Sequence, residues 1–363
     1  MNLDDRARSA TQELVGTQPP DVDTMLEELY RRRQRGSVVR IAATASVLAA
    51  VVLGWAVVQG REPNPPPVGP TEVTNGALVA HGIGTGFSMR MGTVAHLPRD
   101  AEPTTDLQFT ADGAALVYLD RFGRFVAQSV TDGHERVLGE CPASDGDCSF
   151  ALSPDGRRLV VARYDHGAQG LRVVDVGTSS NARVVSREQA MFPTWSPDGA
   201  RLAFIDIHGL HVMAADGSSD RVVVQLGYPD RGVNGRPSWS PDGDRISFVE
   251  ATDIDVPDAP PERTGLRVYR YTLSVVDVGS GEVTDLGDLG YCVCLGTPAP
   301  TQTWSPDGRR IAATSVVEGE DEPLNARVGP MYLVRPDGSG SDQLPPLDAT
   351  SLAWQPVTAN GSD

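Results

Sequence analysis

The segment Thr303-Trp304-Ser305-Pro306-Asp307-Gly308-Arg309-Arg310-Ile311-Ala312 decides the fold, because related segments recur along the chain. Three others keep Ser-Pro-Asp-Gly, one is degenerate and one is truncated; in chain order they are 109–113, 152–156, 195–199, 239–243 and 354–356. We call these six segments the repeat words. Their serine-equivalent positions are separated by 43, 43, 44, 65 and 50 residues, and periods of this size indicate a propeller or a solenoid.

Each repeat word predicts a tight turn between two β-strands. Proline fixes φ at the second position of a type I turn, aspartate tolerates the third, and glycine closes the fourth. Each word has an apolar or aromatic residue just before its serine-equivalent position, and a short β-rich run such as 201–205 follows the complete words. We therefore interpret the repeated aspartates as turn residues rather than as a carboxylate site: Asp112, Asp155, Asp198, Asp242 and Asp307.

Every unit continues with two more strand-like runs, which are 210–213 and 221–224 in the third unit, separated by a glycine turn. We name the four strands of a unit A, B, C and D. The chain ends in an A strand, 352–356, while three runs before the first word (77–80, 86–89 and 93–96) lack one. We predict an all-β, six-bladed β-propeller over 76–357 with four-stranded blades, the last closed by one C-terminal and three N-terminal strands.

Trp-Ser-Pro-Asp-Gly followed by a basic residue and an apolar strand resembles the repeat of TolB-like and WD40-like β-propellers. The resemblance covers about 76–357. It implies a periplasmic or surface binding module, although similar repeats occur in the non-catalytic propellers of prolyl-oligopeptidase-like peptidases and in some sugar lyases. The chain differs from TolB in lacking its separate N-terminal α/β domain.

An uncharged apolar run of 18 residues, 41–58, predicts a single transmembrane helix over 38–59. Five arginines precede the run and one follows it closely, so the positive-inside rule places the N-terminus in the cytoplasm and the propeller outside. A cleavable signal peptide is the alternative, but the leader before the run is longer than an ordinary signal peptide allows. The segment 60–75 is a proline-rich linker and 358–363 a C-terminal tail.

The N-terminal segment 1–37 contains a predicted short amphipathic helix after Pro20, which lies at the membrane surface or contacts a cytoplasmic partner through 1–36. The formal net charge is -17, and since 1–40 holds equal numbers of acids and arginines, this charge belongs to the rest of the chain. An acidic surface argues against nucleic acid as a partner. All 31 basic residues are arginine, which excludes chemistries that need lysine.

No catalytic, cofactor or metal motif is present in the sequence. The six histidines (His81, His96, His134, His166, His208 and His211) show no metal-ligand spacing. Two cysteine pairs are local: we predict a disulfide between Cys141 and Cys148, while Cys292 and Cys294, which bracket one residue, are a second pair whose bond would be strained and easily reduced.

Two insertions lengthen the B–C connections of neighbouring units, at 251–264 and 316–328. In a meander, the B–C and D–A connections share one face of the propeller and the A–B and C–D turns share the other. Function commonly lies in such variable loops, although two solvated acidic loops are the alternative. We therefore predict a partner-binding acidic lip made of Asp253, Asp255, Asp258, Glu262, Glu318, Glu320, Asp321 and Glu322.

These features together predict a membrane-anchored, extracytoplasmic, non-catalytic module that binds a protein or peptide of the cell envelope. Two alternatives come from other classes: an enzyme such as a glycan lyase that uses the central channel, and a transmembrane sensor whose cytoplasmic output is the N-terminal segment.

The predicted topology is testable with a reporter that is active only outside the cytoplasm. Fused after Asp363, it should be active, and changing Arg31, Arg32, Arg33 and Arg35 together to Glu should weaken that orientation. An inactive reporter on the parent chain would contradict the topology.

Overall fold

The computed structural model describes residues 73–82, 86–91, 106–142, 148–163, 170–178, 182–186, 190–227, 230–254, 268–292, 300–318, 326–346 and 349–358. All of these residues belong to the second of two units into which the chain divides, Pro67–Asp363. Within the ranges just given, no helix is long and apolar enough to cross a bilayer. The predicted membrane helix over 38–59 and the segment 1–37 lie outside these ranges.

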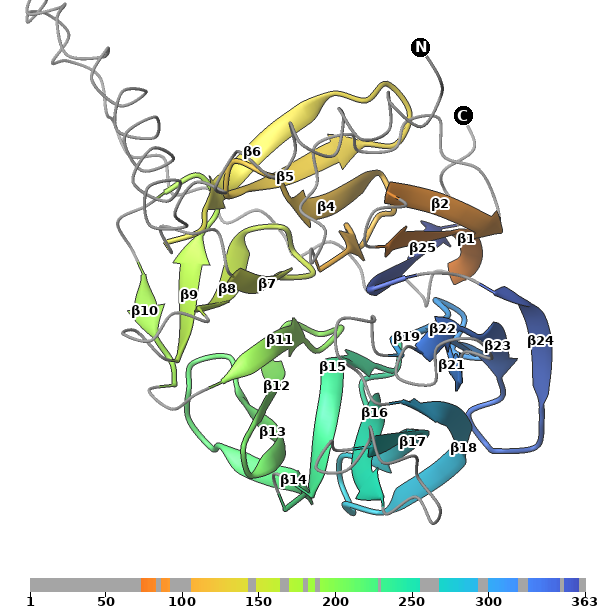
Figure 1. Ribbon diagram of the computed structural model, residues 1–363. Helices are drawn as coiled ribbons and strands as arrows, with labels where there is room; N and C mark the ends of the chain where they lie inside the picture. The colour runs from red at the N-terminus through yellow and green to blue at the C-terminus, as the bar shows by residue number, and fades with distance from the viewer. Residues whose placement is uncertain are drawn as a thin grey trace, which may run out of the picture. The chain divides into compact units, whose positions relative to one another are not determined.

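The described residues of the second unit form antiparallel sheets arranged around a centre, in the manner of propeller blades (Figure 1). Blade 1 consists of β3 (Gln108–Phe109), β4 (Ala115–Leu119), β5 (Arg124–Ser129) and β6 (Glu135–Glu140). Blade 2 consists of β7 (Cys148–Leu152), β8 (Arg158–Arg163), β9 (Leu171–Asp175) and β10 (Arg183–Val184). Blade 3 consists of β11 (Met191–Trp195), β12 (Arg201–Asp206), β13 (Gly209–Ala214) and β14 (Arg221–Gln225).

Two more four-stranded blades follow along the chain. Blade 4 consists of β15 (Arg231–Trp239), β16 (Arg245–Ile254), β17 (Val268–Asp277) and β18 (Val283–Cys292). Blade 5 consists of β19 (Gln302–Trp304), β20 (Ile311–Ala313), β23 (Pro330–Val334) and β24 (Ser341–Pro346). In all five blades the strands pair in chain order, and the strand before each repeat word occupies one edge of its sheet.

A further sheet joins the two ends of the propeller. β25 (Ser351–Thr358) pairs antiparallel with β1 (Val73–Gly82), and β1 pairs with β2 (Gly86–Met91). The register places Leu78 opposite Trp354 and Ala80 opposite Leu352. The pairing of the C-terminal strand with N-terminal strands is as expected, but the structure has five four-stranded blades, not six. This closing sheet has three described strands, because the run expected at 93–96 lies outside the described residues.

Parts of both insertions form β-strands, although loops were expected there. β16 and β17 pair without interruption from Arg245 opposite Asp277 to Ile254 opposite Val268, so the start of the first insertion extends a blade strand. The second insertion contains a separate hairpin, β21 (Val316–Glu318) with β22 (Ala326–Val328). Threonine, tyrosine and valine in these stretches favour extended structure over an open loop.

The apolar core lies between sheets rather than within one central layer. One cluster joins Phe204 of blade 3 to Val160 of blade 2, and another joins Phe248 of blade 4 to Leu210 of blade 3. The closing sheet does the same on both of its faces, because successive side chains of a strand point to opposite sides. Val79 belongs to a cluster with Phe109 of blade 1, and Leu78 to a cluster with Met331 of blade 5.

Removal of residues 351–363 should therefore destabilise the whole propeller and not trim a tail. It exposes the buried side chains of Leu78 and Val79 and leaves β1 with an unpaired edge. We expect the urea midpoint of the cooperative transition to fall, while removal of 359–363 alone leaves it unchanged. Equal midpoints for the two truncations would contradict the closure.

Candidate functional site

A cavity of about 350 Å³ lies among the strands β3, β11, β15, β19 and β25 and beside the turn after β7. Its walls combine aromatic and proline side chains of the repeat words with threonine, serine and glutamine side chains and one arginine. The aromatic and proline side chains are Phe109, Trp195, Trp239, Trp304, Trp354, Pro154, Pro197, Pro241, Pro306 and Pro356. A concave, mostly apolar cavity of this size with a few polar groups is typical of a ligand site.

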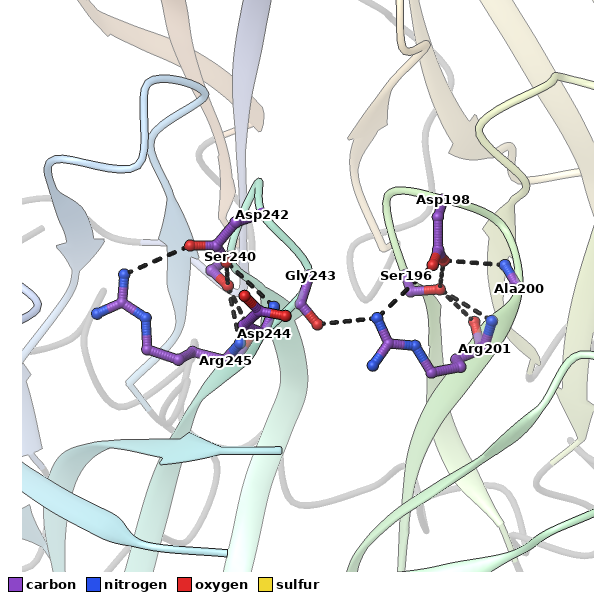
Figure 2. Close-up of polar contacts among 9 residues, drawn as sticks. All are labelled: Ser196, Asp198, Ala200, Arg201, Ser240, Asp242, Gly243, Asp244 and Arg245. Carbon is purple, nitrogen blue, oxygen red and sulfur yellow. Dashed lines mark hydrogen bonds and ion pairs between the residues drawn. The ribbon is translucent and has the colours of Figure 1, made fainter. Parts of the chain in front are cut away.

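The repeat words form a rim of rigid turns beside this cavity. Ser196 Oγ donates a hydrogen bond to Asp198 Oδ1 at 2.5 Å and accepts one from the Arg201 N–H at 2.9 Å (Figure 2). Asp198 Oδ1 also accepts from the Ala200 N–H at 3.0 Å. The glycine, Gly199, has a φ of 68°, which a side chain would strain. The same serine-to-aspartate bond, or its Thr110 equivalent, occurs at Asp112, Asp155, Asp242 and Asp307.

An arginine from one blade fixes the word of the next. The Arg201 guanidinium carbon lies 4.9 Å from the centre of the Trp239 ring. Its Nη2 donates to the Gly243 carbonyl at 3.0 Å, the bond drawn in Figure 2. Stacking of this kind contributes about 0.5–2 kcal/mol, according to its burial. It recurs between Arg158 and Trp195 at 4.6 Å and between Arg245 and Trp304 at 5.0 Å. Arg310, at the matching position of blade 5, pairs with Asp342 at 3.3 Å.

The first strands of neighbouring sheets do not pair with one another through their backbones. Side chains join these strands instead. Besides the bond from the Leu152 N–H to Gln108 Oε1 at 3.0 Å, four buried or half-buried side chains accept a backbone N–H from the next first strand. The acceptors are Ser351 Oγ for Leu107, Asp106 Oδ2 for Phe150, Ser149 Oγ for Phe192 and Ser238 Oγ for Trp304, at 2.9, 3.2, 3.0 and 3.3 Å. We call these four bonds the inner staples. They satisfy backbone donors that face the centre and would otherwise be unpaired.

One arginine connects sheets that are three blades apart. Arg236 of β15 donates from Nη1 to the Leu107 carbonyl at 3.3 Å and from Nη2 to Gln108 Oε1 at 3.2 Å. Gln302 Nε2 donates to the Arg236 carbonyl at 3.1 Å. Burial raises the pKa of the nearby Asp106 carboxyl, and the positive charge of Arg236 and the Phe150 N–H partly offset that increase. Arg236 therefore brings a positive charge to the lining of the cavity.

The predicted acidic lip is only partly visible. Asp253 lies in β16 and Glu318 ends β21. Asp255, Asp258, Glu262, Glu320, Asp321 and Glu322 lie outside the described residues. Both insertions connect second and third strands, whereas the cavity is lined by prolines of the first-to-second turns. The described lining of the cavity therefore includes turns of the face opposite to these connections.

One disulfide and His211 make local contacts within the described fold. Cys141 and Cys148 form the expected disulfide, which joins the residue after β6 to the start of β7. Cys292 ends β18, and Cys294 is not among the described residues. His211 lies between two carboxylates, with Nε2 and Nδ1 each 3.0 Å from an oxygen of Asp206 and Asp220. No group of three or more His, Cys, Asp or Glu suited to a metal ion occurs in the described part of the chain.

Sequence reasoning missed the cavity residues because it interpreted the words as turns alone. A partial signal was present, since each of the last four words has a tryptophan just before its serine-equivalent position. In a propeller these positions lie on the strand nearest the centre. Nothing local distinguishes Arg236, whose partners Leu107 and Gln108 are far away in the chain.

The fold is shared with solved propellers. TolB from Acinetobacter baumannii matches with a TM-score of 0.52 and 16% identity over 77% of this chain. A protein assigned as TolB from Agrobacterium tumefaciens matches with a TM-score of 0.50 and 18% identity over 80% of this chain and 99% of its own. A nidogen/laminin complex matches with a TM-score of 0.52 and 14% identity over 77% of this chain and 98% of the matched chain.

The chain spans 66% of the length of the Acinetobacter protein, just under two thirds. Its sequence matches no protein-family model, and no curated protein is significantly similar. The described structure is thus a TolB-like β-propeller in fold.

The rim turns predict a defined dependence of stability on pH. The hydrogen bond from Ser196, followed by that from the Ala200 N–H, lowers the pKa of Asp198. A carboxyl whose pKa is lower in the folded state contributes stability above its unfolded pKa of about 3.9, and this contribution is lost as pH falls through the folded value. In urea unfolding, Ser196→Ala should therefore be less stable than the parent at pH 7, and the difference should shrink below about pH 4.

Asp198→Asn serves as the matched variant, since it removes the titrating group and keeps the size of the side chain. Its difference from the parent should shrink over the same pH range. A Ser196→Ala deficit of the same size at pH 7 and pH 2.5 would contradict this assignment.

Proposed function

We propose that this chain is a membrane-anchored, extracytoplasmic, non-catalytic β-propeller that binds a protein or peptide at its central cavity. The observation that carries the proposal is the cavity itself, which is lined in part by tryptophan and proline side chains of the rigid repeat words. Anchoring through 38–59, with the N-terminus inside, belongs to the proposal, as does a role of the closing sheet as a sixth blade.

The chemistry of the walls suits a segment of polypeptide. Tryptophan and proline present rigid apolar surface, so little side-chain entropy is lost when a ligand covers them. The words keep these walls in place before any ligand arrives, and such preorganisation favours affinity. The nidogen/laminin complex, which has a similar fold, is an assembly of proteins, and this supports a protein partner.

The acidic lip remains a second proposed surface on the opposite face. It would attract a basic partner, and such an association weakens as salt rises, mainly through the on-rate. Asp253, the one acid of the lip whose side chain is described, does not line the cavity. The two surfaces can therefore be tested separately.

The experiment is capture of a partner from native envelope extract by the immobilised full chain, compared among three variants. Thr303 lines the cavity and Thr284 is exposed on the outer strand β18, so Thr303→Arg and Thr284→Arg differ only in where the same bulk and charge are placed. The third variant neutralises Asp253, Asp255, Glu318, Glu320, Asp321 and Glu322.

We expect Thr303→Arg to reduce capture at least tenfold, while Thr284→Arg and the neutralised variant retain it. Loss in the neutralised variant with retention in Thr303→Arg would move the site to the lip and overturn the cavity assignment. Absence of any partner whose capture depends on one of these surfaces would contradict the binding function. Melting temperatures of all variants show whether each remains folded.

A further inference from the structure

The ring of His211 in blade 3 lies between two carboxylates that come from the elements on either side of β13. Its Nε2 is 3.0 Å from Asp206 Oδ1, and its Nδ1 is 3.0 Å from Asp220 Oδ1. Asp206 ends β12, and Asp220 directly precedes β14. The side chains of His211 and Asp206 are 7% and 2% exposed, whereas that of Asp220 is 40% exposed.

These two contacts decide which form of the ring fits the site. A neutral imidazole has one N–H and one lone pair, so it donates to one carboxylate and turns its lone pair toward the other. An imidazolium donates from both nitrogens, and a bond between two ionised groups is shorter and stronger than one between neutral groups. The geometry therefore fits a doubly protonated His211.

The other charged groups of the elements around the ring belong to blades 2 and 3. Blade 2 is included because its residues share a core cluster with Phe204, on which the His211 ring stacks at 4.9 Å. In blade 3 the charged or titratable residues are Arg201, Asp206, His208, Asp216, Asp220 and Arg221, and in β8, β9 and β10 of blade 2 they are Arg158, Arg163, Arg172, Asp175 and Arg183. Among these side chains, only histidine ordinarily changes its charge between about pH 5 and pH 8.

Loss of one proton from the ring would affect the two carboxylates differently. Asp206 Oδ1 also accepts the backbone N–H groups of His208 and Gly209 at 2.7 and 3.1 Å, and these bonds hold it in place under the ring. A buried carboxylate that loses a donor is left without compensation. Asp220 is more exposed, so water can replace the ring there. The neutral ring would therefore keep Asp206 and release Asp220.

We propose that His211 is a pH-sensitive clamp in blade 3. As an imidazolium it joins Asp206 to Asp220, and as the pH rises and one proton is lost it releases Asp220. The start of the outer strand β14 is then held less firmly, since Val222 of β14 is paired with His211 itself. The proposal concerns the stability of one blade and does not depend on binding at the cavity.

The sign of the effect follows from the form of the ring that the folded state favours. In an unfolded chain a histidine is half protonated near about pH 6.5. A folded state that favours the imidazolium gains stability that is fully present below that pH and is lost as the pH rises and the folded ring gives up its proton. Blade 3 should therefore loosen toward alkaline pH.

The first measurement observes the ring directly in the full chain with ¹⁵N-labelled histidine. At about pH 7, where an ordinary histidine is mostly neutral, both ring nitrogens of His211 should give the signal of a protonated nitrogen. The spectrum of His211→Gln identifies these signals. An unprotonated ring nitrogen in His211 at this pH would overturn the proposal.

The second measurement compares urea midpoints at about pH 5.5 and about pH 9 for the parent, His211→Gln, Asp220→Asn and the double variant. His211→Gln should lower the midpoint at the lower pH, and its deficit should at least halve at the higher pH. The coupling between the two changes should fall in the same way. His208→Gln is the matched control, because this exposed histidine contributes only its backbone N–H to Asp206, and it should leave the midpoint unchanged.

A His211→Gln deficit of equal size at both pH values, without coupling to Asp220→Asn, would assign the ring to packing on Phe204 and overturn the clamp. If His211→Gln does not fold, the ring signals of the parent and the pH dependence of the Asp220→Asn deficit decide the question. Neither His211 nor the two carboxylates line the cavity, so the effect of Thr303→Arg on partner capture tests the proposed function separately.

Discussion

The inner staples are the constraint on which the rest of this propeller depends. The first strand of each blade is an edge strand on the side of the centre, and its backbone donors there have no neighbouring strand to accept them. Small polar side chains fill this role at four junctions, and at one of them the acceptor comes from the C-terminal strand. They hold the first strands at the spacing that creates the cavity.

The same positions that stabilise the ring also build the candidate site. The serine and aspartate of a repeat word fix its turn through their hydrogen bond. The carbonyl of Gly243 accepts a hydrogen bond from Arg201 of the preceding blade, and the same arginine stacks on Trp239. Trp195, Trp239 and Trp304 thus each have one face covered by an arginine of the preceding blade while they line the cavity. The contacts that stabilise the propeller therefore also fix the walls of the cavity, so a ligand would contact walls that are already in position.

The repeat made the blades predictable, because a type I turn needs only the local sequence Ser-Pro-Asp-Gly and the first four turns recur every 43 or 44 residues. The pairing of β25 with β1 was also predictable, since each end of the domain lacked what the other supplied. The acidic insertions were harder, because strand extension in β16 and β17 depends on cross-strand pairing. The contact between Arg236 and Leu107 could not be predicted, since it depends on the closed ring.

Amide hydrogen exchange of the full chain tests most directly whether the inner staples hold the blades together. The amides of Leu107, Phe150, Phe192 and Trp304 should exchange only with global unfolding, as slowly as those of the central strands at Phe204 and Phe248. Exchange of these four amides by local opening, much faster than that of the central strands, would contradict the central role of the inner staples.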